Sequence, residues 1–487
     1  MRSESFYTDM FALHKRDLEQ VMSKAACGGA SYADLYFENS LYRSLTLRDS
    51  IVSSGGFHID YGVGIRVVCG ERTGYSYCET TRMEDMLKAA KVAGSIVQTV
   101  RTDGVSPTGI PVSGVPHVAV SSPLPSTSRA FYPDGSGWDS VDLSQAESLL
   151  CNIEENLRSR DPRIEKVIAR LSCSDSHIMM YNSLDELCFD SRPLWSVAVT
   201  CIFSKGGIRD NCSVSRSFRC GRDVIFGKAL SERIVDDLLH NIDPLLEAGR
   251  PKGGRMSVVM GAGASGILLH EAMGHAFEAD FNRKGQSVFS GRMGQQVCPA
   301  GINIVDDATF ISNRGSMHYD DEGVRGQKTY MVMDGKLNSY LHDRISAEHY
   351  HVAPTGNGRR ESFRYPPIPR MRLTYMENGT ASPGDIIASV KKGVWVDEFS
   401  NGQVQIGQGD FTFYVKSGRL IENGRLTRPI KDINIIGNGP KALQDIVAVG
   451  NDLRIDDSCW TCGKDQSVSV GCGMPTVLVK GLTVGGE

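Results

Sequence analysis

One apolar segment constrains this chain most strongly, because it can only be a helix buried inside a larger domain. Residues 264–280 read "ASGILLHEAMGHAFEAD", and apolar residues surround a helix built from them on nearly all sides: Ile267, Leu268, Leu269, Ala272, Met273, Ala276 and Phe277. A helix that is hydrophobic all round lies inside a protein. His270, Glu271 and His275 therefore need partners, since burying two imidazoles and a carboxylate without compensation costs several kcal/mol.

The spacing of the two histidines predicts an irregular helix. His270 and His275 are five residues apart, one more than in the His-Glu-x-x-His motif of zinc peptidases. On a regular helix, five positions leave two side chains about 140° apart, whereas a π-type bulge of about 4.4 residues per turn brings them within about 50°. We therefore expect a bulge, eased by Gly274, that lets both imidazoles bind one metal ion. The alternative is two core histidines bonded to backbone carbonyl groups.

Glu271 distinguishes a catalytic metal site from a structural one. Its neighbour His270 points elsewhere, so the carboxylate can face a metal-bound water, remove its proton and later pass that proton to a leaving amine. A catalytic zinc ion has three protein ligands and one open position, so a further ligand must come from outside the helix. The motif predicts one Zn²⁺ per chain, with another divalent metal as the alternative.

A glycine-rich turn precedes this helix. Gly261, Gly263 and Gly266 have the G-x-G-x-x-G order of a dinucleotide-binding turn and follow the strand-like "RMSVVM". That motif needs a second strand ending in an acidic residue about 20 positions on, but Asp280 follows continuing helix. We therefore favour a tight turn that lets strand and helix pack closely.

The 487 residues are enough for two domains, and we expect an α+β protein with a boundary near residue 250. Residues 1–250 are predicted to form an α/β domain with helices near 8–26, 81–98, 142–159 and 223–249. A Pro-, Gly- and Ser-rich connection spans about 103–140. Residues 251–487 should form a β-rich domain, mainly antiparallel, that carries the metal helix. Its hairpins are expected at Asp334-Gly335 and at Asn423-Gly424.

Charge and cysteine usage exclude several classes of partner. Lys and Arg number 53 against 57 Asp and Glu, and no long block of like charge occurs. Neither nucleic acid nor a membrane surface is favoured as a partner. The first 20 residues are charged throughout, no long apolar run follows, and the 13 cysteines are scattered. We expect a cytoplasmic protein whose cysteines are mostly buried thiols.

Several long stretches, in matching order, resemble the TldD/PmbA family of peptidases, historically called modulators of DNA gyrase. They are "GILLHEAMGHAFEADFNRKGQSVFSGRMG", "DDEGVRGQKTYMVMDGKL", "PTGNGRRES", "PRMRLTYM" and "CGKDQSVSVGCGMPTVLVKGLTVGGE". The chain is similar to the TldD branch, because the PmbA-like branch lacks the histidine motif and acts as a non-catalytic partner.

The resemblance implies a metallopeptidase with His270 and His275 as ligands, Glu271 as catalytic carboxylate, and a cysteine ligand from "CGK", which maps onto Cys462. It also implies unfolded or flexible peptides as substrates and a heteromeric complex with a PmbA- or TldE-like chain, with a homodimer as the alternative. The rival function is a non-catalytic, metal-stabilised subunit that binds peptides or regulates another enzyme.

Other residues leave alternatives open. Cys459 precedes Cys462 in C-x-x-C spacing, and both thiolates with two histidines would make a closed structural zinc site; we favour Cys462 alone. Arg359 and Arg360 could bind a peptide carboxylate, although a structural ion pair with Glu361 or another acid is the commoner explanation. Asp320, Asp321 and Glu322 could supply oxygen ligands to a metal ion, although a solvated acidic turn is the commoner explanation. His349 and His351 could act as hydrogen-bond donors to the transition state.

Overall fold

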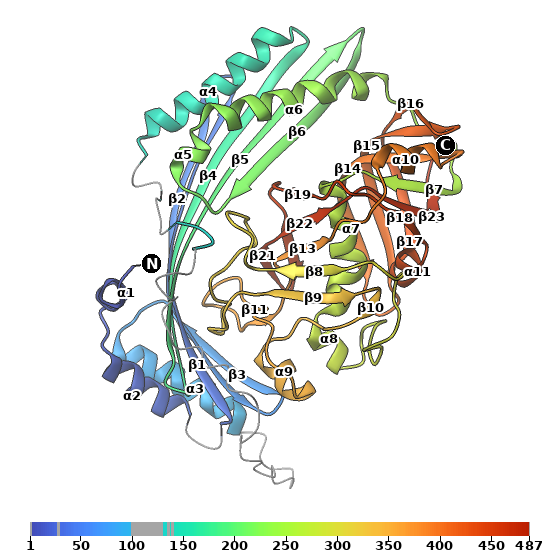
Figure 1. Cartoon of the computed structure of the whole chain (residues 1–487). Coiled ribbons are helices and arrows are strands. Elements are labelled where there is room, and N and C mark those ends of the chain that lie inside the picture. The colour runs from blue at the N-terminus through green and yellow to red at the C-terminus, as the bar shows by residue number, and fades with distance from the viewer. Residues whose placement is uncertain (1, 27–29, 99–129, 134–136, 138–140, 487) are drawn as a thin grey trace.

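A computed structural model of the chain describes residues 2–26, 30–98, 130–133, 137 and 141–486. The connection expected at about 103–140 lies almost wholly outside these residues. The chain has the expected α+β composition, with one large sheet and its helices in the N-terminal part and a β-rich C-terminal part (Figure 1).

The N-terminal sheet has six strands in the order β3-β2-β1-β4-β5-β6, and all five pairings are antiparallel. The first strand is long, with 17 residues. The strands are β1 (Tyr32–Arg48), β2 (Ile51–Cys69), β3 (Arg72–Cys78), β4 (Ile164–Asn182), β5 (Leu187–Lys205) and β6 (Ile208–Phe218).

The prediction of one continuous helix near residues 8–26 is wrong, because two helices occupy this region. The structure has α1 (Glu4–Phe11) and α2 (Lys15–Ala25), separated at Ala12, whose left-handed φ of 52° ends the first helix. Asp17 then accepts a hydrogen bond from the His14 backbone N–H and starts the second. The other expected helices are present as α3 (Met83–Gln98), α4 (Leu143–Arg160) and α6 (Lys228–Glu247), the last preceded by the short α5 (Arg222–Ile225).

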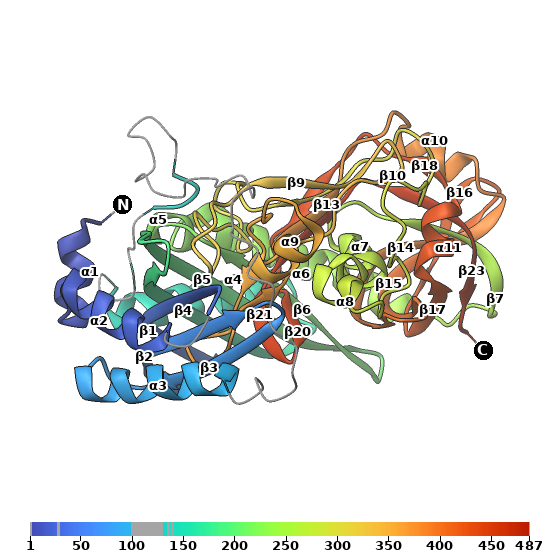
Figure 2. The ribbon, with the colours of Figure 1, turned by 90° about the horizontal axis from the view of Figure 1, so that it is seen from below.

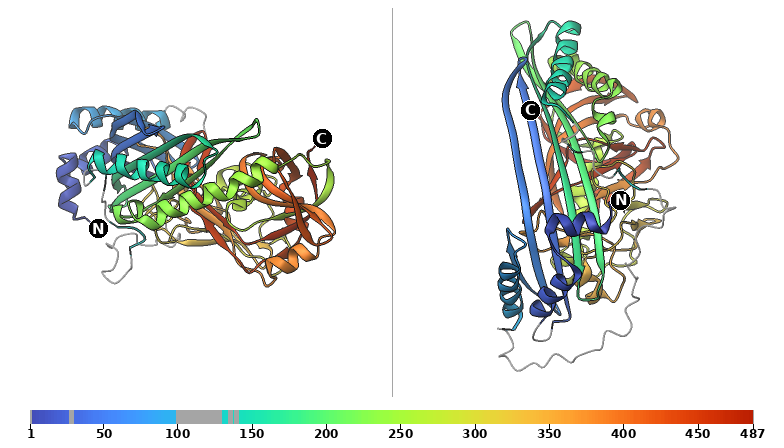
Figure 3. Two further views of the ribbon diagram at one scale, coloured as in Figure 1. Left: turned by 90° about the horizontal axis from the view of Figure 1, so that it is seen from above. Right: turned by 90° about the vertical axis from the view of Figure 1, so that its left-hand side faces the viewer.

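Alternation along β1 gives the sheet two different faces. Leu35 and Phe37 pack in a cluster with α2 and α3, and Leu45 and Leu47 pack with α4 and α6. Tyr36 points to the opposite face, where it joins residues of the C-terminal part. Figure 3 shows the two helix groups at opposite ends of the long sheet, and Figure 1 shows the C-terminal part against the sheet.

The C-terminal part contains a closed barrel. Strands β14, β7, β23, β17 and β15 pair in this order, and β15 pairs again with β14. The β14–β7 pairing is parallel and the rest of the ring is antiparallel. These strands are β7 (Gly254–Met260), β14 (Lys392–Gln405), β15 (Asp410–Glu422), β17 (Ile433–Asn438) and β23 (Val477–Val484), with β16 (Arg425–Ile430) beside β15 and β18 (Ile446–Val449) beside β23.

A second sheet has the order β10-β9-β8-β13-β22-β19, with a parallel β13–β22 pairing. Its strands are β8 (Ile304–Asp307), β9 (Lys328–Met333), β10 (Lys336–Leu337), β13 (Leu373–Met376), β19 (Arg454–Asp456) and β22 (Gly471–Met474). Both predicted hairpins are confirmed, because Asp334-Gly335 joins β9 to β10 and Asn423-Gly424 joins β15 to β16, each with positive φ at both turn residues.

The smaller elements of this part surround the two sheets. They are β11 (Gly358–Arg359) paired with β12 (Ile368–Pro369), β20 (Thr461–Lys464) paired with β21 (Gln466–Ser469), and the helices α8 (Ala279–Arg283), α9 (Arg344–Tyr350), α10 (Pro383–Ala388) and α11 (Gly439–Gln444). Within the described part of the chain, no helix is both long and apolar enough to cross a membrane.

The acidic segment 320–322 is buried, so the expectation of a solvated turn is wrong. Asp321 and Glu322 are each 2% exposed, and both bind arginines of the N-terminal sheet. Arg66 of β2 binds Glu322 as well as Asp34 of β1, and Arg192 of β5 binds Asp321. The segment lies where the two parts of the chain meet, and its charges are satisfied there by ion pairs in place of water.

Candidate metal centre

The glycine-rich turn follows strand β7 and lets the metal helix pack closely against another strand, β22. Gly263 has a φ of 100°, a conformation that strongly favours glycine. A Cβ atom at Gly266 would lie 2.5 Å from the backbone nitrogen of Gly473 in β22. The turn therefore serves close packing, with β22 as the strand in close contact with Gly266, and the helix begins with the 3₁₀ turn η2 (Ala264–Gly266) and α7 (Ile267–Leu269).

The predicted bulge is confirmed. A π-helical turn, η3 (His270–Gly274), follows α7, and the His275 backbone N–H donates to the carbonyl oxygen of His270, five residues earlier. The helix continues as the 3₁₀ turn η4 (His275–Phe277). Gly274 has ordinary helical angles, φ −56° and ψ −51°, so backbone freedom is not its role. A Cβ atom there would lie 2.0 Å from the sulfur of Met371, so Gly274 makes room for that side chain.

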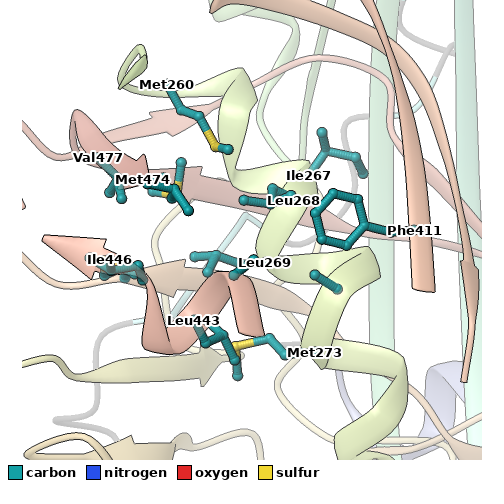
Figure 4. Packing of buried hydrophobic residues seen from close by; sticks show 14 of the residues in the cluster. Met260, Ile267, Leu268, Leu269, Met273, Phe411, Leu443, Ile446, Met474 and Val477 are labelled. Carbon is teal, nitrogen blue, oxygen red and sulfur yellow. The ribbon is translucent and has the colours of Figure 1, made fainter. Parts of the chain in front are cut away.

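The helix is buried, as its composition predicts. Leu268, Leu269 and Met273 belong to a core cluster that includes Phe411 of β15 and Met474 of β22, and Figure 4 shows this packing from close by. Figures 1 and 2 both place α7 between the N-terminal sheet and the barrel strands. This packing fixes the position of the helix that carries His270 and His275.

The structure brings together His270, His275 and Cys462. One potential ligand atom from each lies within 4.8 Å of the other two, and all three residues are buried. The Cys462 sulfur is 3.3 Å from Nε2 of His275, and the two imidazole centroids are 5.0 Å apart. Nδ1 of His270 has no hydrogen-bond partner in the described part of the chain. Two imidazoles and a thiol are suitable ligands for a zinc-type ion, and the buried His270 nitrogen without a partner is consistent with such a site.

The electrostatics of the cluster favour a thiolate. Burial alone would raise the pKa of Cys462, but His270 and His275 outweigh it and lower this pKa to about 4. Burial would also lower the pKa of His275, yet Glu278 and Cys462 raise it well above its usual value. The cluster thus contains a negatively charged sulfur at neutral pH, the form of cysteine that binds metals.

Glu271 lies at the edge of this cluster and is half-buried. Burial raises its pKa, and the neighbouring His270 and His275 oppose that shift. A carboxyl group with a raised pKa suits proton transfer near neutral pH.

Glu278 and Lys464 are part of the site but were not found from the sequence. Oε2 of Glu278 is 3.1 Å from Nδ1 of His275, and Nζ of Lys464 is 3.0 Å from the same oxygen. Burial would raise the pKa of Glu278, but Lys464 and His275 lower it to about 2. The only sequence signal is the spacing of three residues from His275, which is too common to identify such a pair.

Cys459 is not part of the cluster. Its sulfur lies 3.8 Å from the carbonyl oxygen of Arg216 in β6, and its backbone N–H donates to the Ser215 hydroxyl. Within the described ranges, the only group of three or more His, Cys, Asp or Glu side chains close enough to hold a metal ion is His270, His275 and Cys462.

The other candidate residues lie outside the cluster. Arg360 is buried and paired with Asp34, so it forms the structural ion pair that was the commoner explanation, although not with Glu361. Arg359 donates to the carbonyl oxygens of Met371 and Ser469. His349 binds Glu71, and His351 is exposed at the end of α9.

Comparison with known proteins identifies the family. The PmbA/TldA metallopeptidase domain 1 matches residues 33–97, the central domain matches 137–241, and the C-terminal domain matches 253–486. The metalloprotease TldD homolog of Haemophilus influenzae is 36% identical over 461 residues, which cover 93% of each chain. This chain belongs to the PmbA/TldD metallopeptidase family, as its sequence stretches predict.

More distant proteins share the same length and fold. The zinc metalloprotease TldD homolog of Saccharolobus solfataricus is 26% identical and covers 96% of this chain and 99% of its own. TldE of Thermococcus kodakarensis has a TM-score of 0.72 at 18% identity, covering 96% of this chain and all of its own. A candidate modulator of DNA gyrase from Thermotoga maritima has a TM-score of 0.75 at 19% identity, covering 96% and 99%. These two structures support the fold alone.

We predict that Cys462→Ser loses bound zinc and peptidase activity, whereas Cys459→Ser retains both, because only the Cys462 sulfur faces the imidazoles. The measurement is zinc content of the purified variants by elemental analysis, together with hydrolysis of an unfolded peptide. Equal zinc loss in the two variants would contradict a site with a single thiolate.

Proposed function

We propose that this chain is a zinc-dependent peptidase that hydrolyses peptide bonds of unfolded or flexible polypeptides. The observation that carries this proposal is the buried cluster of His270, His275 and Cys462, with Glu271 beside it. Membership of a metallopeptidase family and a relative named as a zinc metalloprotease support the same conclusion.

The residues of the cluster would divide the chemistry between them. His270, His275 and Cys462 would hold the ion through two imidazoles and one thiolate. A zinc ion with such ligands supplies Lewis acidity and lowers the pKa of water in its open position to about 7. Glu271 removes a proton from the attacking water and passes it to the leaving amine. The Cys462 thiolate would supply one negative charge to the site and thereby partly neutralise a bound divalent ion.

Two further expectations accompany this function. We propose that residues 1–250 and 251–487 are separate domains, which is supported by the start of the barrel at Gly254 and by the family domain that begins at residue 253. We also propose that the enzyme works in the cytoplasm, which is supported by the free state of all cysteines in the described part of the chain.

Glu271→Gln tests the catalytic role directly. We expect unchanged zinc content and a loss of peptidase activity of about 10²-fold or more, since general-base catalysis contributes 10²–10⁴-fold. Glu348→Gln, an exposed residue of α9, is the matched control and should keep full activity. If Glu271→Gln cleaves an unfolded peptide as fast as the parent, the chain is better described as the rival metal-stabilised binding or regulatory subunit.

The proposed preference for flexible chains predicts that a denatured protein is digested faster than its folded form. The three residues of the cluster are buried, so a compact folded surface is not expected to reach them, and backbone pairing of an extended strand tolerates many side chains. The measurement compares how fast the enzyme digests one substrate protein in its native form and in its unfolded, reduced and alkylated form. Faster loss of the native form would contradict the preference.

The proposed partner is a PmbA- or TldE-like chain, with a homodimer as the alternative. The similarity of this fold to TldE supports a partner of the same architecture, because two such chains can pair around a pseudo-twofold axis. We expect light scattering to give the mass of a heterodimer when the two chains are mixed, and activity to rise with it. A monomer under both conditions would exclude both assemblies.

A further inference from the structure

The ring of His275 is held from both sides by buried groups. Its Nε2 lies 3.3 Å from the Cys462 sulfur, and its Nδ1 lies 3.1 Å from Oε2 of Glu278. We propose that Glu278 is the positioning residue of the metal centre: it fixes the tautomer and orientation of His275 so that Nε2 is presented to the ion. This inference rests on the proposed function and extends it to a residue outside the ligand set.

The backbone around Glu278 brings its carboxylate back toward the ring. The helix is interrupted at this residue, whose φ of −66° and ψ of 126° are extended and separate η4 from α8. Its backbone N–H still donates to the carbonyl oxygen of His275, at 3.2 Å, so the interruption is a tight turn. A continuing helix would carry the side chain onward with α8, whereas this turn keeps it beside the residue three positions earlier.

The negative charge of Glu278 is stabilised from the other side of the site. The Glu278 side chain is completely buried and receives Lys464 Nζ at 3.0 Å, while Arg370 Nε lies 3.9 Å from its second oxygen. Lys464 lies two residues beyond Cys462 on β20, so these side chains share one face of the hairpin. Arg370 also donates to the carbonyl oxygen of Cys462, at 2.6 Å. The same two cations therefore connect the thiol ligand to the carboxylate behind the histidine ligand.

This arrangement has a definite consequence for His275. A carboxylate that accepts from Nδ1–H keeps a proton on Nδ1, so Nε2 is the nitrogen left to bind an ion once its own proton is released, and the carboxylate makes the imidazole more basic. His270 has no equivalent, because its Nδ1 lacks a hydrogen-bond partner among the described residues. The two histidines thus differ, and His275 is the one whose orientation is set before an ion binds.

Cobalt(II) binding tests the inference without relying on catalysis. In Glu278→Gln the carboxylate charge is lost, and we expect Co²⁺ affinity, measured against a competing chelator, to fall by about 10- to 100-fold. The visible absorption bands of bound Co²⁺ should also change, because the geometry of the His275 ligand is no longer fixed. Asp280→Asn is the matched control, because Asp280 binds the same Lys464 Nζ at 2.8 Å but forms no hydrogen bond or ion pair with His275 among the described residues. The Co²⁺ affinity of this variant should stay within about twofold of the parent.

A second variant guards against loss of the fold. If Glu278→Gln unfolds because Lys464 loses a buried partner, Glu278→Gln combined with Lys464→Met removes both charges, and its thermal unfolding should resemble that of the parent. Its Co²⁺ affinity should remain low. Parent-like affinity in a folded Glu278 variant, or an equal loss in Asp280→Asn, would overturn the positioning role while leaving the proposed function intact. Failure of the parent chain itself to bind Co²⁺ or Zn²⁺ would instead contradict the proposed function.

Discussion

The candidate site depends on one backbone hydrogen bond, from the N–H of His275 to the carbonyl oxygen of His270. This five-residue step makes a π turn. The turn places on one side of the helix two histidines that a regular helix would separate. The turn is costly in isolation, and it is stabilised by the packing of the helix among buried residues of the barrel and the second sheet. Gly266 and Gly274 contribute by their lack of a side chain, since β22 and Met371 occupy the space where a Cβ atom would lie.

The second requirement is that β20 meets this helix, because the third potential ligand lies 187 residues further along the chain. Two features hold the hairpin in place. Arg370 binds two of its carbonyl oxygens, those of Cys462 and Gln466, and Lys464 connects it to Glu278. A separate set of buried ion pairs, among them Arg66 with Glu322, joins the C-terminal part to the N-terminal sheet. Buried pairs of this kind contribute little net stability, but removing one partner is costly because it leaves an uncompensated buried charge.

The geometry also separates the alternatives considered for the site. A closed site with two thiolates requires Cys459, which instead faces Arg216 of β6. Two histidines bonded only to backbone carbonyl groups would not place a cysteine sulfur 3.3 Å from one ring. A purely structural site would have no use for the half-buried carboxyl group of Glu271, whose pKa is raised by its burial. Family membership and geometry therefore support the same class of protein by independent routes.

The sequence by itself determined the buried helix, its π turn, both hairpins and the strands around them, because each depends on residues a few positions apart. Resemblance to a family added Cys462, which no local pattern could have chosen over Cys459. Only the tertiary structure decided the role of Glu278 and Lys464, which lie 186 residues apart, and the burial of Asp321 and Glu322. Charged residues are usually solvated, so a sequence favours the surface for them; their burial depends on which arginine or lysine the rest of the fold delivers to the same place.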